Sequence, residues 1–219
     1  MKNVEILYED DNIIILNKPA GLAVQGGEGV KSSLDRLLAE IRVPAPLLVH
    51  RLDKDTSGCI LTAKTKKAAA DLSRLMGSRK TVKQYIAVCA WHLSGAGIIS
   101  ADLNIRGSIK KAETKYKILK KITLNSPLTL KYSILELEPG TGRMHQIRRH
   151  LAMNGTPVLG DDKYGDFKLN KELRRTMGLK RLLLHASRLV INDTYNLNIT
   201  APLPEYFKIF YLKENNLYT

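Results

Sequence analysis

The sequence has very few cysteines and no long apolar run. Of its 219 residues only Cys59 and Cys89 are cysteines, and both lie in apolar stretches. Because neither has metal-ligand neighbours at a recognisable spacing, we expect buried free thiols and no metal site. No apolar run approaches the roughly 18 residues of a membrane-spanning helix, so we expect no contact with a membrane.

Patterns for nucleotide cofactors and for export are also missing. Neither a P-loop nor a dinucleotide-binding fingerprint occurs in the sequence. The start of the chain, Met1–Glu5, has no apolar core after a basic residue and does not predict a signal peptide. We therefore expect a cytoplasmic protein in a reducing compartment, and a monomer.

Acidic residues are scarce relative to basic ones. The chain has 35 Lys and Arg against 21 Asp and Glu, a net charge of +14 and a pI of about 9.8. Residues 1–50 hold five Lys and Arg against seven Asp and Glu, a net charge of −2, so the remainder carries +16. This balance predicts attraction to nucleic acid. The alternative is that the lysines serve only solubility.

Apolar runs between turn residues predict more strands than helices. Strands are expected over residues 4–8, 12–16, 81–90, 98–105, 114–122, 128–137, 182–191 and 195–199. Helices are expected over residues 34–41, 66–76, 143–153 and 204–212, and a polar, basic connection over 160–181. Neighbouring strands indicate an α+β fold with a largely antiparallel mixed β-sheet and flanking helices. No repeat, linker or composition break occurs, so residues 1–219 are expected to form one domain.

A polar loop, His50–Gly58, lies between two apolar runs. Its sequence, HRLDKDTSG, holds a base, an acid and small hydroxyls within nine residues. A charged loop on a rigid scaffold is a common way to build an active site. The alternative is a turn whose Asp and Ser bond their own backbone.

A second polar segment, Gly140–His150, has the sequence GTGRMHQIRRH. As the start of a helix it could grip phosphate through backbone N–H groups and the guanidinium groups of Arg143, Arg148 and Arg149. The alternative is a solvated helix face. His145 and His150 would lie on different helix faces, so a zinc pair is not expected.

These two segments resemble the signatures of the RluA-type pseudouridine synthases, which isomerise uridine within RNA. Further segments match in family order and extend the resemblance from Glu5 to Phe207: residues 17–22 (NKPAGL), 83–87 (KQYIA), 155–165 (GTPVLGDDKYG) and 182–186 (LLLHA). The glycine-rich loop at residues 26–29 and the segment 161–166 are most similar to the branch that acts on large-subunit ribosomal RNA. Many members carry a small RNA-binding domain before the first strand. Since this chain begins almost at that strand, we expect the catalytic domain alone, around a central RNA-binding cleft.

The resemblance implies roles for single residues. Asp53 would be the covalent nucleophile, and Arg143 would pair with it and favour the charged carboxylate in a poorly hydrated pocket. Tyr85 would stack on the target base and could handle its C5 proton, although a strand tyrosine is ordinarily a core or surface residue. Arg51 would fill the space left by the flipped uridine. The other substrate-binding candidates are Leu183 and Leu184, as the apolar wall of the uracil pocket, with Lys18, Arg148 and Arg149; His185 is expected to be structural.

The implied reaction breaks the N-glycosidic bond, rotates the uracil and rejoins it through C5. It needs no reductant, nucleotide or metal, so we expect no cofactor, and RNA, above all ribosomal RNA, as the partner. Three alternatives stay open: a transfer RNA pseudouridine synthase of the same family, an inactive RNA-binding ribosome assembly factor, and a magnesium-dependent nuclease. The nuclease would use Asp53, Asp55, Asp161 and Asp162, and would stop in excess chelator.

Overall fold

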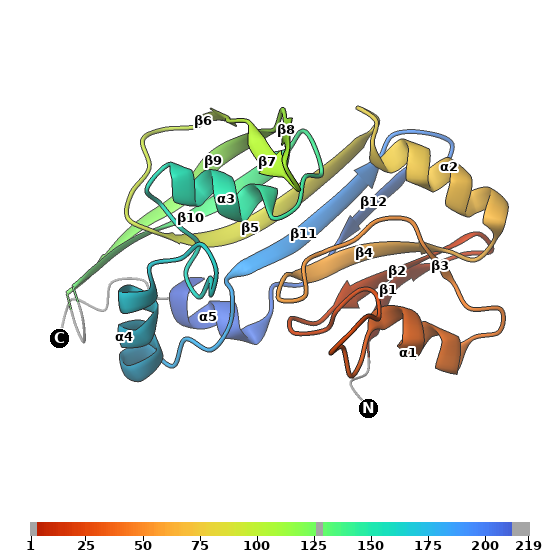
Figure 1. Cartoon of the computed structure of the whole chain (residues 1–219), viewed down its shortest axis with the longest axis horizontal. Coiled ribbons are helices and arrows are strands. Elements are labelled where there is room, and N and C mark those ends of the chain that lie inside the picture. The colour runs from red at the N-terminus through yellow and green to blue at the C-terminus, as the bar shows by residue number, and fades with distance from the viewer. Residues whose placement is uncertain (1–3, 126–128, 212–219) are drawn as a thin grey trace. The chain divides into compact units, whose positions relative to one another are not determined.

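The computed structural model describes residues 4–125 and 129–211, which fall into two compact units (Figure 1). Of the described residues, unit 1 holds 4–84 and 185–202, and unit 2 holds 85–125, 129–184 and 203–211. Each unit combines two stretches that are distant in the sequence, so no composition change along the chain could mark a boundary. The expectation of one catalytic domain around a central cleft stays a prediction.

Unit 1 is a sheet with two helices. Its strands are β1 (Glu5–Glu9), β2 (Ile13–Lys18), β3 (Leu47–Leu48), β4 (Ser57–Ala63), most of β11 (Leu184–Ile191) and β12 (Leu197–Thr200); its helices are α1 (Leu34–Ile41) and α2 (Lys66–Met76). The strand order is β1-β2-β4-β11-β12, with β3 beside β4. Every pair is antiparallel except β4 with β11. Strand β4 is buried along its whole length, so the loop that precedes it starts from a fixed base.

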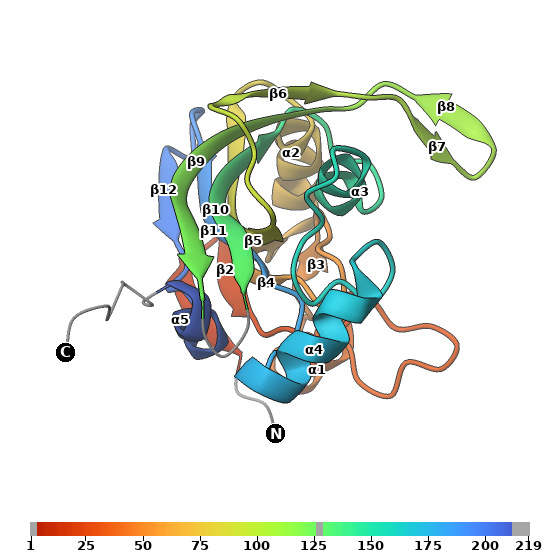
Figure 2. The same cartoon turned by 90° about the vertical axis from the view of Figure 1, so that its left-hand side faces the viewer.

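Unit 2 is an antiparallel sheet with three helices (Figure 2). It holds most of β5 (Thr81–Ala90), then β6 (Gly97–Ser100), β7 (Leu103–Ile105), β8 (Ser108–Lys110), β9 (Glu113–Leu124), β10 (Leu130–Pro139), α3 (Gln146–Met153), α4 (Phe167–Met177) and α5 (Glu205–Tyr211). The strand order is β5-β10-β9-β6, and β7 with β8 forms a separate hairpin. Helix α3 packs on β9 and β10.

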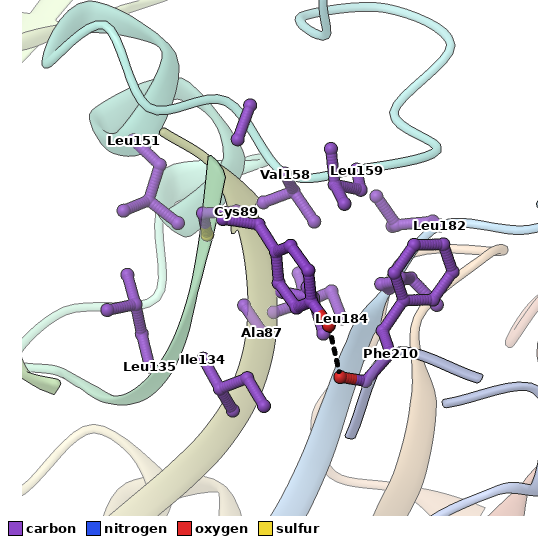
Figure 3. Close-up of a cluster of buried hydrophobic side chains, with 14 of the residues drawn as sticks. Ala87, Cys89, Ile134, Leu135, Leu151, Val158, Leu159, Leu182, Leu184 and Phe210 are labelled. Carbon is purple, nitrogen blue, oxygen red and sulfur yellow. Dashed lines mark hydrogen bonds between the residues drawn. The ribbon is translucent and has the colours of Figure 1, made fainter. Parts of the chain in front are cut away.

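Figure 3 shows part of the apolar core of unit 2, and Tyr132 of β10 is a member of this core. The Tyr132 ring is fully buried, and its hydroxyl donates to the Phe210 backbone oxygen at 2.8 Å. A buried phenol needs such a partner, because an unpaired hydroxyl in an apolar core is costly. Cys89 is a member of this core, Cys59 is buried in unit 1, and both are free thiols, as predicted.

The α+β class and the largely antiparallel mixed sheet with flanking helices are confirmed, but three elements were predicted wrongly. The helix expected from Arg143 begins at Gln146, because His145 has a left-handed backbone (φ +52°) that a helix cannot include. Met144, in the turn before this helix, is 46% exposed. The strand expected over 98–105 is split into β6 and β7.

The third wrong prediction is the connection over residues 160–181, which contains α4. Asp166 caps that helix by accepting from the Leu169 N–H at 2.9 Å, and Leu173 and Met177 are buried on one side. Within the described part of the chain, no helix is both long and apolar enough to cross a membrane.

Candidate active site

The loop before β4 is tied down by the amine of Lys18. Lys18 is fully buried, and its Nζ donates to the backbone oxygens of Pro19 (3.0 Å), Leu22 (2.8 Å) and Lys54 (2.9 Å). The Gly21 N–H also donates to the Lys54 oxygen at 2.9 Å. A buried ammonium committed to backbone carbonyls is a structural brace. This placement argues against Lys18 as a substrate contact.

Glycine and histidine fix the two ends of the same loop. Gly58 has φ +109°, and a Cβ added there would lie 2.1 Å from the Ala186 oxygen, so only glycine fits. His50 Nε2 accepts from the Leu61 N–H at 2.9 Å. Burial, together with the charge of Lys83, lowers the pKa of His50 to about 4. His50 is therefore neutral near pH 7 and serves as a hydrogen-bond acceptor.

Between these anchors the loop presents Arg51 and Asp53. Leu52 is buried, whereas Arg51 is exposed and Asp53 is half-buried. The Thr56 N–H donates to the Asp53 backbone oxygen at 3.2 Å, and Thr56 itself is buried. The loop thus offers a carboxylate and a guanidinium from a backbone that is held at several points.

In unit 2, Arg143 lies in the turn that leads into α3. Buried Gln146 holds this turn: its Oε1 accepts from the Arg143 N–H at 3.1 Å, and its Nε2 donates to the Glu113 oxygen at 2.7 Å. The Arg143 side chain is exposed, and its Nε makes one long bond, 3.4 Å, to the Lys111 oxygen. The turn is fixed while the guanidinium is only weakly held. Gln146 is not among the residues predicted from the sequence, although an amide inside a basic segment is a signal for a buried hydrogen-bond bridge.

The two arginines that follow are committed to protein partners. Arg148 is buried and forms a bidentate ion pair with Asp161, in which Nε donates to Oδ2 at 2.8 Å and Nη2 donates to Oδ1 at 2.7 Å. Burial alone would raise the pKa of Asp161, but Arg148 and two backbone N–H groups outweigh it and hold that pKa below its usual value. This pairing argues against a phosphate contact by Arg148. Arg149 is half-buried and donates to the Asn104 oxygen at 3.0 Å.

Tyr85, Leu183 and Leu184 belong to the core region of unit 2. Half-buried Tyr85 lies opposite Leu137 of β10 and packs against the apolar cluster. Leu183 and Leu184 are buried, and Leu184 lies among the clustered side chains of Figure 3. Their expected roles against a uracil ring stay predictions.

His185 is a structural residue of unit 1, as the sequence indicated. Its Nδ1 lies 2.9 Å from Ser57 Oγ and its Nε2 lies 3.3 Å from the Ala201 oxygen. Among the described residues, no three His, Cys, Asp or Glu side chains are grouped so as to hold a metal ion.

Comparison with known proteins decides the family. Residues 12–153, which include Asp53, Tyr85 and Arg143, match the family described as RNA pseudouridylate synthase. The chain belongs to the RNA pseudouridylate synthase family. This pseudouridine synthase is 37% identical over 220 residues to "Ribosomal large subunit pseudouridine synthase C" of Rickettsia bellii (strain RML369-C), an alignment that spans 92% of this chain and 69% of that protein.

Two further comparisons agree. The protein of the same name from Vibrio parahaemolyticus is 35% identical over 213 residues, covering 90% of this chain and 65% of the relative. The solved structure of "Human RNA Pseudouridylate Synthase Domain Containing 4" has a TM-score of 0.78 at 28% identity and covers 94% of this pseudouridine synthase and 90% of the human chain. Family and fold together make the chain an RNA-modifying isomerase.

Proposed function

We propose that this pseudouridine synthase isomerises uridines in large-subunit ribosomal RNA, with Asp53 as the covalent nucleophile. The observation that carries the proposal is the braced loop of unit 1. The loop is held in place by contacts of Lys18, His50 and Gly58. Asp53 is the half-buried carboxylate that this loop carries. A nucleophile must be held in a reactive position and still be reachable, and the loop meets both needs.

The other site residues take the roles that the family resemblance implies. Arg51 is exposed, and its flat guanidinium can stack in the space that a flipped uridine leaves. Arg143, held by one long bond, supplies the positive partner of the carboxylate during the reaction. Tyr85 stacks on the base, with Leu183 and Leu184 as the apolar wall behind it.

The choice of ribosomal RNA rests on the relatives and on charge. The curated relatives are named for the ribosomal large subunit. The net charge of +14 favours a long polyanion, because each neutralised phosphate releases counterions. RNA held mainly through its backbone would bind with little dependence on sequence, and the pocket would then select uridine.

Pseudouridine mapping tests the proposal. Unmodified large-subunit ribosomal RNA and unmodified transfer RNA are each incubated with the wild-type protein and with Asp53→Ala in excess chelator, then treated with a pseudouridine-specific adduct and read by primer extension. We expect new stops in ribosomal RNA with the wild type only. Stops in transfer RNA alone would move the substrate class, and RNA binding without any stop would favour the assembly-factor alternative.

A further inference from the structure

Helix α4 is a strongly basic element that the proposed mechanism does not use. Within Phe167–Met177 there are four Lys and Arg and one acidic residue, Glu172. Asn170, Leu173 and Met177 form the buried side of the helix. The four cations, Lys168, Lys171, Arg174 and Arg175, are all exposed.

Most of this charge is not neutralised by the protein. Arg175 pairs with Glu172 at 2.6 Å, but in the described part of the chain no carboxylate lies within ion-pair distance of Lys168, Lys171 or Arg174. The basic strand β9 differs, since Lys115 lies 3.8 Å from Glu138 and Lys117 faces Glu136 in the neighbouring strand. Lys168, Lys171 and Arg174 therefore form a row of cations without acidic partners among the described residues, which suits a negatively charged ligand.

An exposed aromatic ring extends the same row. Phe167 is 62% exposed at the start of α4. Phe167, Lys171 and Arg174 stand at positions i, i+4 and i+7, which places them along one line of the helix. An aromatic ring beside cations is the combination that binds unpaired RNA, because the ring stacks on a base while the cations meet phosphates. An acidic protein segment would match the cations but would leave the ring without a specific role.

The helix is also held rigidly at its beginning. The Asp166 carboxylate accepts from the Leu169 N–H at 2.9 Å. Buried Asn170 accepts from the Gly160 N–H and donates to the Asp161 oxygen, both at 2.9 Å. Asp161 is in turn held by Arg148. A surface fixed in this way loses little freedom when it binds.

We propose that the exposed row of α4, Phe167, Lys168, Lys171 and Arg174, binds an unpaired segment of the substrate RNA outside the reacting nucleotide. The cations contact successive phosphates and Phe167 stacks on one base. The inference rests on the proposed function in taking RNA as the ligand. It adds a second RNA-binding surface to the site that binds the reacting uridine.

Equilibrium binding of a fluorescent, mixed-sequence single-stranded oligoribonucleotide tests this, with the full chain and a series of salt concentrations. The test variant is Lys168→Gln/Lys171→Gln/Arg174→Gln. Helix α2 supplies a matched control, Lys66→Gln/Lys67→Gln/Arg74→Gln, which removes the same three charges from exposed positions of another helix. Circular dichroism checks that both variants are folded.

We expect the α4 variant to bind about tenfold or more weakly at low salt. The slope of log K against log salt should fall by about 2, since each phosphate contact to a single strand contributes about 0.7. The α2 control should change affinity less than about twofold. Lys168→Arg/Lys171→Arg, which keeps the charges, should retain wild-type binding, and Phe167→Leu should weaken binding to the single strand more than to an RNA duplex.

An unchanged slope in the α4 variant, or equal losses in the α2 and α4 variants, would overturn the inference. If Phe167→Leu weakens neither RNA, the stacking contact is refuted. The result is separable from the proposed function. RNA binding through α4 without pseudouridine formation would refute the function alone, and pseudouridine formation with an unaltered α4 slope would refute the inference alone.

Discussion

Replacing Lys18 by methionine removes the brace under the Asp53 loop and should destabilise the protein strongly. Methionine is unbranched like lysine and one heavy atom shorter, so most of the packing is kept, but the buried donor to the oxygens of Pro19, Leu22 and Lys54 is lost. The Lys54 oxygen keeps the bond from the Gly21 N–H. The cost therefore falls mainly on the oxygens of Pro19 and Leu22, at about 1–3 kcal/mol for each carbonyl left without a partner.

We expect the free energy of unfolding to fall by about 3 kcal/mol in total, which corresponds to a decrease in Tm of about 6–12 °C for a chain of this size. Urea unfolding followed by circular dichroism measures the change. Lys54→Met is the matched control, because it removes an exposed lysine and leaves the Lys54 backbone oxygen in place; it should alter stability by less than about 0.5 kcal/mol.

One pattern of results would refute this reasoning. If Lys18→Met unfolds like the wild type but binds RNA much more weakly, Lys18 is a substrate contact and the structural role is wrong. A loss of stability with nearly unchanged RNA binding by the folded protein would support the brace.

Three further predictions concern the same site. Gly58→Ala should lower the free energy of unfolding in urea by at least about 3 kcal/mol, because the added Cβ would clash with the Ala186 backbone. Gly29→Ala is the control: Gly29 has φ +73° but open space around it, so this variant should lose only about 1–2 kcal/mol. Equal losses in the two variants would refute the close-contact argument. Burial lowers the pKa of His185 to about 4, so the folded protein binds fewer protons than the unfolded chain between pH 6.5 and 4. His185 should therefore contribute a fall of about 3 kcal/mol in the free energy of unfolding as pH drops through that range, in addition to the fall that His50 contributes, and His185→Gln should give a flatter profile than the wild type. Arg143→Met should slow pseudouridine formation about a hundredfold or more while Arg74→Met on α2 leaves it unchanged, and a near-normal rate for Arg143→Met would remove Arg143 from its role.

Local signals in the sequence predicted most of the fold. Helix α2 has Thr65 as its N-cap and ends at Gly77, and its bounds were predicted correctly because caps and apolar spacing agree. Helix α4 was missed because its apolar residues are spread among many charges, so the segment looked like a solvated connection. The helix after Arg143 was predicted too long because nothing in the sequence marks His145 as left-handed.

The positions of the candidate site residues were harder to predict than their identities. Lys18 and Arg148 are cations in a basic member of an RNA-modifying family, so a contact with the substrate was the natural expectation. Three acceptors of Lys18 Nζ are backbone oxygens, one of them 36 residues away, which no side-chain pattern can reveal. The Arg148 pair with Asp161 spans 13 residues and depends on the turn after α3.

The most direct test of the central claim is the rate of pseudouridine formation by Asp53→Asn, measured together with RNA binding. The amide keeps the size of the side chain but is a far weaker nucleophile than a carboxylate. We predict that turnover on large-subunit ribosomal RNA is abolished while affinity for that RNA stays within a few-fold of the wild type. Retained turnover by a verified Asp53→Asn protein would contradict the account.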